Sequence, residues 1–387
     1  MPEDKHSSTH PPLPPTTEDD RVSWLRLLRS RRVGPSTFHR LMAEHGNAAA
    51  ALQALPEVAR AAGVENYQPC TAETAEAEIR AARQVGARMI CIGEAGYPPA
   101  LARVADAPPL LWAVGEMSVL EKPAIAMVGA RNASSLGTRM ATALARGLAE
   151  EGYVIVSGLA RGIDTAAHLA AKESGTIAVM AGGVDIIYPA ENARMGEDIT
   201  DAGLRLSEQP MGMTPQARHF PPRNRIISGL AVALVVVEAA AKSGSLITAR
   251  AALDQGREVL AVPGHPFDAR AAGCNMLVRD GATLVRGPAD VIDALPRSHA
   301  PAPQPDLPLA DIPDPPPETR TLRDTAALHR QILDRLGPTP LAEDQLIRDL
   351  SAPAAMVTPV LTDLELDGKV ARHPGGLLSL AGKAGTG

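Results

Sequence analysis

Two arginines lie in glycine-containing turns, where an arginine is suited to binding an oxyanion. Arg131 ends the motif Gly129-Ala130-Arg131, and Arg161 lies in Gly158-Leu159-Ala160-Arg161-Gly162. A guanidinium next to the backbone amides that open a helix suits a phosphate group, because both supply positive charge and N–H donors. The alternative role for each arginine is an ion pair that braces its own loop. The pattern favours phosphate binding at both positions.

Further polar stretches border apolar runs in the same way. They cover residues 181–189, 220–229 and 238–245. Within the last of them, Ser243-Gly244-Ser245 stands directly before a helical pattern and is expected to expose helix N-terminal amides to an oxyanion. Lys242 adds a flexible cation next to this turn. These stretches are expected to converge on one anion-binding edge.

The acids and the histidine near these turns do not form a catalytic set. Asp164 and Asp185 are expected to cap helices or fix turns, and His168 lies on an alanine-rich helical face, which favours packing. Glu238 emerges at a strand end without an evident partner. We therefore predict no catalytic residue, no metal and no cofactor. The three cysteines lack CxxC spacing, so the sequence supports neither a disulfide framework nor a zinc site.

Regularly spaced apolar runs predict the elements that hold these turns. Short apolar runs alternate with alanine-rich helical stretches such as 138–150 and 163–172, which is the pattern of a doubly wound, mostly parallel, Rossmann-like α/β sheet. Ligands of such sheets bind beyond the carboxyl ends of the strands. The expected strands are 88–92, 124–128, 153–157, 176–180, 203–207, 232–238, 258–262 and 282–286.

Several nucleotide-binding classes are disfavoured by missing residues. The turn at Gly129 is not GxGxxG, because Arg131 replaces the second glycine, and the chain contains no GxxxxGK[ST] loop. A phosphoribohydrolase-like enzyme on a related fold is the alternative function. Such enzymes need a PGGxGTxxE segment, and Gly182-Gly183-Val184-Asp185 lacks both the Gly-Thr pair and the following acid.

The N-terminal region has two parts. Residues 1–20 are rich in Pro and polar residues and are expected to be disordered. Residues 21–86 form a small helical domain, in which residues 32–41 resemble an incomplete helix-hairpin-helix (SAM-like) turn. Six arginines and no acid lie within residues 21–40. A packing module with a solvated basic face is favoured over a phosphate-binding hairpin.

The C-terminal region consists of a linker and a small domain. Residues 296–320 form a stiff, acidic, Pro-rich linker. Residues 321–382 follow the winged-helix order, with helices at 325–336, 341–349 and 354–367 and a ribbon formed by 369–372 and 377–380. The third helix carries Asp363, Glu365 and Asp367, so a protein-contact role is favoured over reading duplex DNA.

Whole-chain composition sets outer limits. The chain of 387 residues has a formal net charge of −6, which argues against a uniformly basic coat but permits a local basic site. Its length predicts more than one domain. No run of about 18 apolar residues is present, which excludes a membrane-spanning helix, and a cytoplasmic location is expected.

Several long motifs, in the right order, resemble the DNA-processing protein A family (DprA/Smf). They are the two arginine turns with Ser157 and Asp164, residues 220–229, Val237-Glu238-Ala239 with residues 243–246, and Val262-Pro263-Gly264 with Gly273-Cys274-Asn275. The resemblance covers residues 20–295, and the tail resembles the winged-helix domain that many members carry. The central domain is expected to span residues 87–295.

The resemblance implies binding of single-stranded DNA without marked sequence preference. Family members protect incoming strands in natural transformation and load a RecA-type recombinase, usually as homodimers, and a single-strand binding protein is a further expected partner. A dimer patch is expected around residues 273–281. A scaffold that chiefly recruits recombinase is a third hypothesis.

The resemblance also assigns roles to individual residues. Arg131 and Arg161 correspond to DNA-contacting basic residues, and the ring of Phe220 offers a stacking surface for a base. Arg223 and Arg225 have two open roles, as DNA contacts or as partners of carboxylates such as Glu208 or Glu238, and the alternative role of Asn224 is to hold its turn. The expected DNA-binding residues are Gly129, Ala130, Arg131, Ser157, Gly158, Arg161, Gly162, Phe220, Arg223, Asn224, Arg225, Lys242, Ser243, Gly244 and Ser245.

Overall fold

The computed structural model describes residues 13–295, 322–337, 339–350, 352–366, 369–373 and 377–380. The chain divides into two compact units, residues 1–298 and 299–387, and each is described by itself. The expected linker, residues 296–320, lies outside the described residues, as do residues 1–12 of the expected N-terminal tail.

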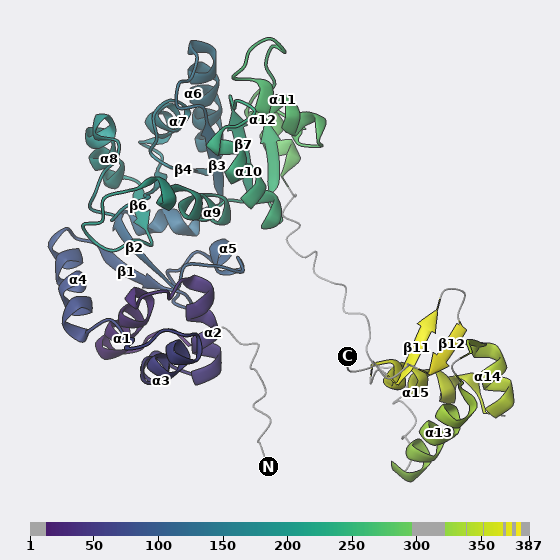
Figure 1. Ribbon diagram of the computed structural model, residues 1–387. Coiled ribbons are helices and arrows are strands. Elements are labelled where there is room, and N and C mark those ends of the chain that lie inside the picture. Colours follow the sequence, from purple (N-terminus) through teal and green to yellow (C-terminus); the bar gives the residue numbers. More distant parts are fainter. Residues whose placement is uncertain are drawn as a thin grey trace, which may run out of the picture. The chain divides into compact units, whose positions relative to one another are not determined.

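Four helices form the N-terminal part of the first unit (Figure 1). A reciprocal capping box of Thr17 and Asp20 starts the first helix at Glu18, so the first turn includes residues that the sequence assigned to the tail. Pro35 occupies the first turn of the second helix, where its missing N–H costs nothing. The rings of Trp24 and Phe38 meet edge to face in the core. The helices are α1 (Glu18–Arg29), α2 (Pro35–His45), α3 (Ala48–Ala61) and α4 (Ala72–Gln84).

A nine-stranded sheet carries the rest of the unit, in the order β1-β2-β6-β5-β4-β3-β7-β8-β9. Within this order, the neighbouring strands β6, β5, β4, β3, β7, β8 and β9 pair in parallel, whereas β1 and β2 add an antiparallel edge. All the strands predicted from the sequence are present, and β2 was missed. The strands are β1 (Arg88–Cys91), β2 (Leu110–Gly115), β3 (Ala124–Gly129), β4 (Val154–Ser157), β5 (Thr176–Val179), β6 (Leu204–Ser207), β7 (Ala233–Val237), β8 (Glu258–Ala261) and β9 (Thr283–Leu284).

Helices cover both faces of the sheet, as in doubly wound folds. Ile125 and Met127 of β3 belong to the core under α6 and α7, whereas Ala126 and Val128 belong to the core that includes α9 and α10. This alternation follows from the two-residue repeat of a strand. The helices are α5 (Pro99–Ala102), α6 (Ser135–Glu150), α7 (Ile163–Ala171), α8 (Ala193–Asp198), α9 (Phe220–Leu230), α10 (Gly244–Asp254), α11 (Ala272–Arg279) and α12 (Pro288–Ala294), with 3₁₀ turns at Met117–Glu121, Ala190–Asn192, Ile199–Asp201 and Ala217–His219.

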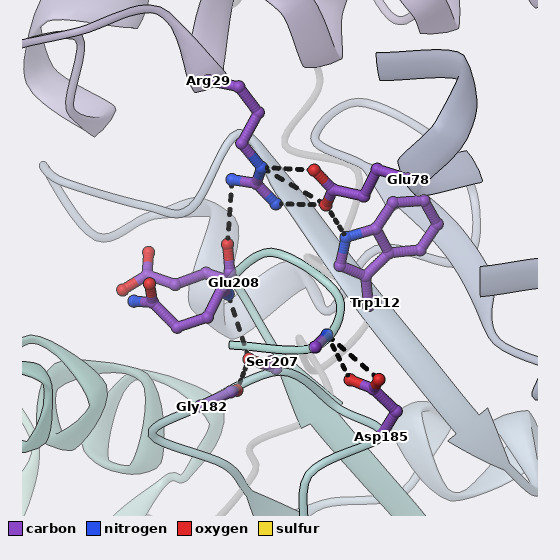
Figure 2. A network of polar contacts seen from close by, with 9 residues as sticks. Arg29, Glu78, Trp112, Gly182, Asp185, Ser207 and Glu208 are labelled. Atoms are coloured by element: carbon purple, nitrogen blue, oxygen red, sulfur yellow. Dashed lines mark hydrogen bonds and ion pairs between the residues drawn. The ribbon is translucent and has the colours of Figure 1, made fainter. Parts of the chain in front are cut away.

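The N-terminal helices are joined to the antiparallel edge of the sheet by a buried polar network (Figure 2). Arg29 of α1 forms a bidentate ion pair with Glu78 of α4, at 2.8 Å for its shortest contact. Glu78 also accepts a hydrogen bond of 2.8 Å from the indole of Trp112 in β2. A second Arg29 nitrogen donates to the backbone carbonyl of Glu208, beyond β6. Four segments distant in sequence are thereby fixed to one another.

Other arginines of the basic N-terminal segment are also engaged in contacts within the unit. Arg21 pairs with Glu94, and Arg26 donates to the Cys70 carbonyl. Arg31 and Arg32 remain exposed at the turn between α1 and α2. The basic face that the sequence suggested is therefore smaller than its arginine content implied.

The second unit has the winged-helix order. Arg372 of the ribbon pairs with Glu343 and Glu365, so the basic group of this wing is neutralised within the unit. The expected turn of the ribbon, residues 374–376, lies outside the described residues. The elements are α13 (Leu322–Arg335), β10 (Leu341–Ala342), α14 (Glu343–Leu350), α15 (Ala354–Leu366), β11 (Val370–His373) and β12 (Leu377–Leu380), with the strands in the antiparallel order β10-β12-β11.

Candidate functional site

A cleft of about 880 Å³ opens where the strand order reverses, between β3 and β7. Sheets of this type bind ligands at that point, because loops on the two sides diverge and leave a crevice. The walls come from the turns after β3, β4 and β7 and from the first turns of α9. A smaller pocket of about 360 Å³ shares Arg131, Tyr188 and Phe220 with the cleft and extends to Arg161.

Close backbone contacts hold the first two turns together. A Cβ at Gly129 would overlap the Val237 carbonyl, and a Cβ at Gly162 would overlap the Ala130 carbonyl. Gly162 also has φ +76°, a conformation that L side chains rarely adopt. The Ile163 N–H donates to the Ala130 carbonyl at 3.2 Å. Gly129 is required because β7 passes close to it, and Gly162 because the turns after β3 and β4 touch.

The N-terminus of α6 already holds a carboxylate. Glu238, at the end of β7, accepts hydrogen bonds from the N–H (2.8 Å) and the hydroxyl of Ser134, the N-cap residue of α6. Its backbone has φ +55°, and Gly137 leaves room for the carboxylate, which a Cβ there would overlap. A helix N-terminus attracts negative charge, and here the chain supplies that charge itself.

The turn that precedes α7 holds a second carboxylate. Asp164 is buried and accepts hydrogen bonds from the N–H groups of Gly158 (3.1 Å) and Ala160 (3.3 Å). Burial raises the pKa of this carboxyl, which the nearby Arg223 opposes. The amides of Ser134, Gly158 and Ala160 therefore already donate to carboxylates of the chain, and the binding of phosphates at these two turns stays a prediction. The expected turn-fixing role of Asp164 is confirmed.

Beneath this turn lies the guanidinium of Arg223. Its Nη1 donates to the carbonyls of Gly158 (2.6 Å) and Val179 (2.7 Å), and burial lowers its pKa to about 10. The side chain is only 5% exposed. Of the two roles left open by the sequence, the geometry favours the structural one, although its partners are carbonyls and the buried Asp164 and not Glu208 or Glu238.

His168 completes the closed end of α7. Its Nδ1 bonds to the Thr176 hydroxyl at 2.8 Å, and its Nε2 accepts from the Leu159 N–H at 3.4 Å. Because Thr176 donates its own proton to a backbone carbonyl, Nδ1 carries the imidazole proton. Burial lowers the pKa of His168 to about 3. The ring is neutral and structural, as the sequence indicated.

The N-terminus of α10 is different. Its N-cap, Ser243, accepts from the Ser245 N–H and bonds to the Ser245 hydroxyl at 2.7 Å, and no acid lies in the first turn. A Cβ at Gly244 would meet no atom within 4 Å. Lys242 is exposed beside it, and all four residues line the cleft. This end matches the expected anion site.

Cations and rings face one another at the opposite wall. The Arg131 guanidinium lies 5.3 Å from the centroid of the Phe220 ring, and the Tyr188 ring lies 6.1 Å from the same ring. Arg131 is exposed. Arg161 is exposed as well but forms a bidentate pair with Glu191, so its charge is partly compensated. Arg131 is the cation best placed for a ligand.

Three expected site residues have structural contacts. Arg225 lies outside the cleft and pairs with Glu208 (2.6 Å) and Asp106 (3.0 Å), with only 12% of its side chain exposed. The Ser157 hydroxyl is buried and donates to a β3 carbonyl. Asn224 does line the cleft, and its Oδ1 accepts from Arg223 at 3.2 Å. The partner role weighed for Arg225 is confirmed.

The cleft lining includes residues that were not among those expected, and Tyr188 and Arg270 are an aromatic and a cationic example. Tyr188 belongs to the stretch 181–189, which the sequence placed at this edge without assigning a residue. Arg270 also lines the cleft, from the loop after β8. Little in the sequence indicated a site role for Arg270, because it lies between two motif segments. In the structure it pairs locally with Asp268.

Two searches of the described residues gave negative results. No group of three or more His, Cys, Asp or Glu side chains there could hold a metal ion. None of the described helices has the length and apolar character needed to cross a membrane.

A helical hairpin domain, a doubly wound sheet with a cationic cleft and a winged helix together define a three-part protein of the DNA-processing class. The family model "DNA recombination-mediator protein A" matches residues 88–296. The models "DprA-like N-terminal HHH domain" and "DprA winged helix domain" match residues 18–81 and 315–376. The chain belongs to this family, the DprA/Smf family that its motifs resembled.

Individual relatives agree with this assignment. DNA processing protein DprA of Streptococcus pneumoniae is 46% identical over 198 residues, which are 51% of this chain and 70% of the relative. Protein Smf of Escherichia coli is 38% identical over 290 residues, which are 73% of this chain and 75% of the relative.

Solved structures agree as well. That of the Streptococcus pneumoniae protein superposes with a TM-score of 0.56 at 34% identity, over 71% of this chain and 93% of the other. DNA processing protein A of Helicobacter pylori, reported for its single-stranded DNA binding mode, superposes with a TM-score of 0.50 at 30% identity, over 54% of this chain and 94% of the other.

Proposed function

We propose that this protein binds single-stranded DNA in the cleft between β3 and β7, without marked sequence preference and without catalysis. The observation that carries the proposal is the pairing of two unlike walls. One wall presents Lys242, Arg270 and the open end of α10, and the other presents Arg131 beside the half-buried ring of Phe220 and Tyr188. Cations and stacking rings are what sequence-tolerant strand binding requires.

The strand contacts follow from charge and accessibility. Phosphates would bind at Arg131 and at Lys242 with the Ser243-Gly244-Ser245 turn, and bases would stack against Phe220. Arg161 would contribute if a phosphate displaces Glu191 from its exposed pair. Because these phosphate contacts are ionic, affinity should fall as salt rises. The Helicobacter pylori relative reported to bind single strands supports the same ligand for this chain.

The wider role is proposed from family membership. We infer that the protein protects incoming strands during natural transformation in the cytoplasm and loads a RecA-type recombinase onto them. It would act as a homodimer and in contact with a single-strand binding protein. The neutralised wing of the C-terminal unit favours a protein partner for that unit, because Arg372 is already paired.

A nucleotide-processing enzyme is the weaker alternative. Two carboxylates near the cleft are engaged in the fold: Glu238 accepts from Ser134, the N-cap residue of α6, and Asp164 accepts from the N–H groups of Gly158 and Ala160. Amides of the turns after β3 and β4 thus already donate to the chain's own acids. Neither acid is placed to act on a bound nucleotide.

The test is fluorescence anisotropy with labelled oligo-dT across a salt series, with duplex DNA and AMP as competitors. The wild type is compared with an Arg131→Ala/Arg161→Ala variant. We expect salt-sensitive binding that the double variant loses by about 100-fold, since each charged phosphate contact contributes about 1.5 kcal/mol. A matched control is Arg146→Ala, which removes an exposed arginine of α6 that does not line the cleft.

The outcomes separate the hypotheses. Competition by AMP with weak oligonucleotide binding would reject strand binding and return the search to nucleotide hydrolysis. Strong binding that survives the double variant would keep the function but move the site to the exposed arginines Arg31 and Arg32 of the N-terminal domain.

A further inference from the structure

One phenylalanine of the first unit lies almost wholly in water. Phe267, on the loop between β8 and α11, is 95% exposed. The chain has only three phenylalanines; of the others, Phe38 is buried in the N-terminal core and Phe220 lines the cleft. A single exposed apolar side chain is common on protein surfaces. The construction and position of the loop set this one apart.

The loop is held by its own hydrogen bonds. The Gly264 N–H donates to Asn275 Oδ1 at 3.1 Å, and Asn275 Nδ2 donates back to the Gly264 carbonyl at 3.0 Å. The Phe267 N–H donates to His265 Nδ1 at 3.3 Å, and the two rings lie 5.5 Å apart at 41°. The aromatic ring is therefore held outward by ordered structure.

The same loop is a wall of the cleft. Arg270, three residues beyond Phe267, lines the cleft together with Lys242 and Gly244. It pairs with Asp268 of the same loop. The loop therefore continues the surface that begins at the open end of α10.

Strand order places the aromatic residues along one row. Strands β5, β4, β3, β7 and β8 are consecutive neighbours in the sheet. Tyr188 follows β5 at one end of this row, and Phe267 follows β8 at the other. A DNA strand that crosses the cleft from Phe220 past Lys242 would reach the loop after β8.

We propose that Phe267, with His265 beside it, is a second base-stacking position for the bound DNA strand, reached only by strands long enough to cross the cleft. The proposal rests on the proposed function and names one occupant, a nucleobase of single-stranded DNA. Stacking on an aromatic face accepts every base. Arg270 and Lys242 would hold the phosphates that lead to this position.

The test compares affinity at several strand lengths, using the full chain. Labelled oligo-dT between about 4 and 16 nucleotides, the range of single-strand site sizes, is titrated into the wild type and Phe267→Ala. The shortest strands should bind both proteins equally. The longest should bind the variant about five- to tenfold more weakly, the loss expected for one stacked base.

Two controls isolate the aromatic ring. Phe267→Tyr keeps a planar ring and should bind like the wild type at every length. Leu253→Ala removes another exposed apolar side chain, 59% exposed on α10 and outside the cleft lining, and should change nothing.

A spectroscopic signal checks contact directly. The native tryptophans, Trp24 and Trp112, are only 3% and 1% exposed. The Phe267→Trp variant therefore carries a single exposed indole, and long strands should quench its fluorescence whereas the shortest should not.

Three results would overturn the proposal. Equal affinity of wild type and Phe267→Ala at all lengths, with strong wild-type binding, rejects the stacking position and leaves the proposed function standing. A variant that weakens binding equally at all lengths and sediments as a smaller species makes Phe267 a subunit contact instead. A wild type that binds no oligonucleotide rejects the proposed function itself.

Discussion

The N-termini of α6 and α7 differ from that of α10, although all three helices begin at the same edge of one sheet. Carboxylates of the chain lie at the first two, where Glu238 accepts from Ser134, the N-cap residue of α6, and Asp164 of α7 accepts from the turn that precedes its helix. The third is capped by the hydroxyl of Ser243 and opens into the cleft beside Lys242. A helix N-terminus is a site for a foreign anion only where the chain does not provide its own.

This difference bears on which ligands the protein selects. A mononucleotide site cradles a terminal phosphate in the amides of a turn. Here the amides of Ser134, Gly158 and Ala160 already donate to the chain's own acids, so the proposed binding would depend more on side chains that stand apart, such as Arg131 and Lys242. Separated cations suit the repeating phosphates of a DNA strand better than a single phosphate group.

Substitutions at the N-terminal ends of α7 and α10 should differ most in how far they lower the stability of the fold. Arg223→Met leaves Asp164 buried without its countercharge and removes hydrogen bonds to two carbonyls. We expect the free energy of unfolding to fall by about 3–5 kcal/mol, measured by urea denaturation. Lys242→Met removes a charge at the open end and should change stability by less than about 0.5 kcal/mol. Equal losses in both variants would contradict the comparison.

Acid should weaken the closed end of α7 through His168. Burial holds its folded pKa at about 3, below the ordinary 6.5, so only the unfolded chain takes up this proton between those values. The stability is complete above pH 6.5 and declines as pH falls towards 3, by about 1.4 kcal/mol per pH unit. Urea denaturation at several pH values should give a shallower dependence for His168→Gln. Parallel curves for both proteins would disprove this contribution.

The cap of α6 should depend on the charge of Glu238 more than on its shape. Glu238→Gln keeps the side chain's size but replaces a charged acceptor by a neutral one. We expect a loss of about 1–2 kcal/mol in thermal unfolding, because hydrogen bonds to charged groups are the stronger ones. Glu191→Gln, an exposed acid at the cleft rim, serves as the matched control. The interpretation fails if the two variants are equally stable.

Closing the open end should convert it into a copy of the other two. Gly244→Asp places a carboxylate at α10 without a clash, since a Cβ there meets nothing within 4 Å. We expect stability to rise by about 0.3–1 kcal/mol, while oligo-dT affinity falls about tenfold, a change of 1.4 kcal/mol. Gly244→Ala should leave affinity unchanged. An unaltered affinity in Gly244→Asp would show that strands do not use this end.

The sequence predicted the parallel sheet well, because buried strands and alanine-rich helices leave strong periodic patterns. It missed β2, where the run Leu110-Leu111-Trp112-Ala113-Val114 lies just after two prolines. That strand pairs antiparallel with β1 and β6. Short runs outside the βαβ repeat carry no periodic context, so their pairing emerges only in three dimensions.

The sequence predicted which turns line the cleft but only some of their side-chain contacts. The turns of Arg131 and of residues 242–245 do line one cleft. What the sequence did not reveal was the partner of each charge, such as Glu191 for Arg161 or Asp106 for Arg225. Ion pairs join residues far apart in the chain, and local patterns do not encode them.

The pairing of β3 with β7 also sets when the cleft can exist. These strands are adjacent in the sheet, yet β4, β5 and β6 lie between them in the chain. A growing polypeptide that has produced only β3 to β6 holds half a sheet with an open edge at β3. Long-range pairings are slow to form because a large loop must close first. The cleft therefore depends on a long-range pairing, because its lining comes from the turns that follow both β3 and β7.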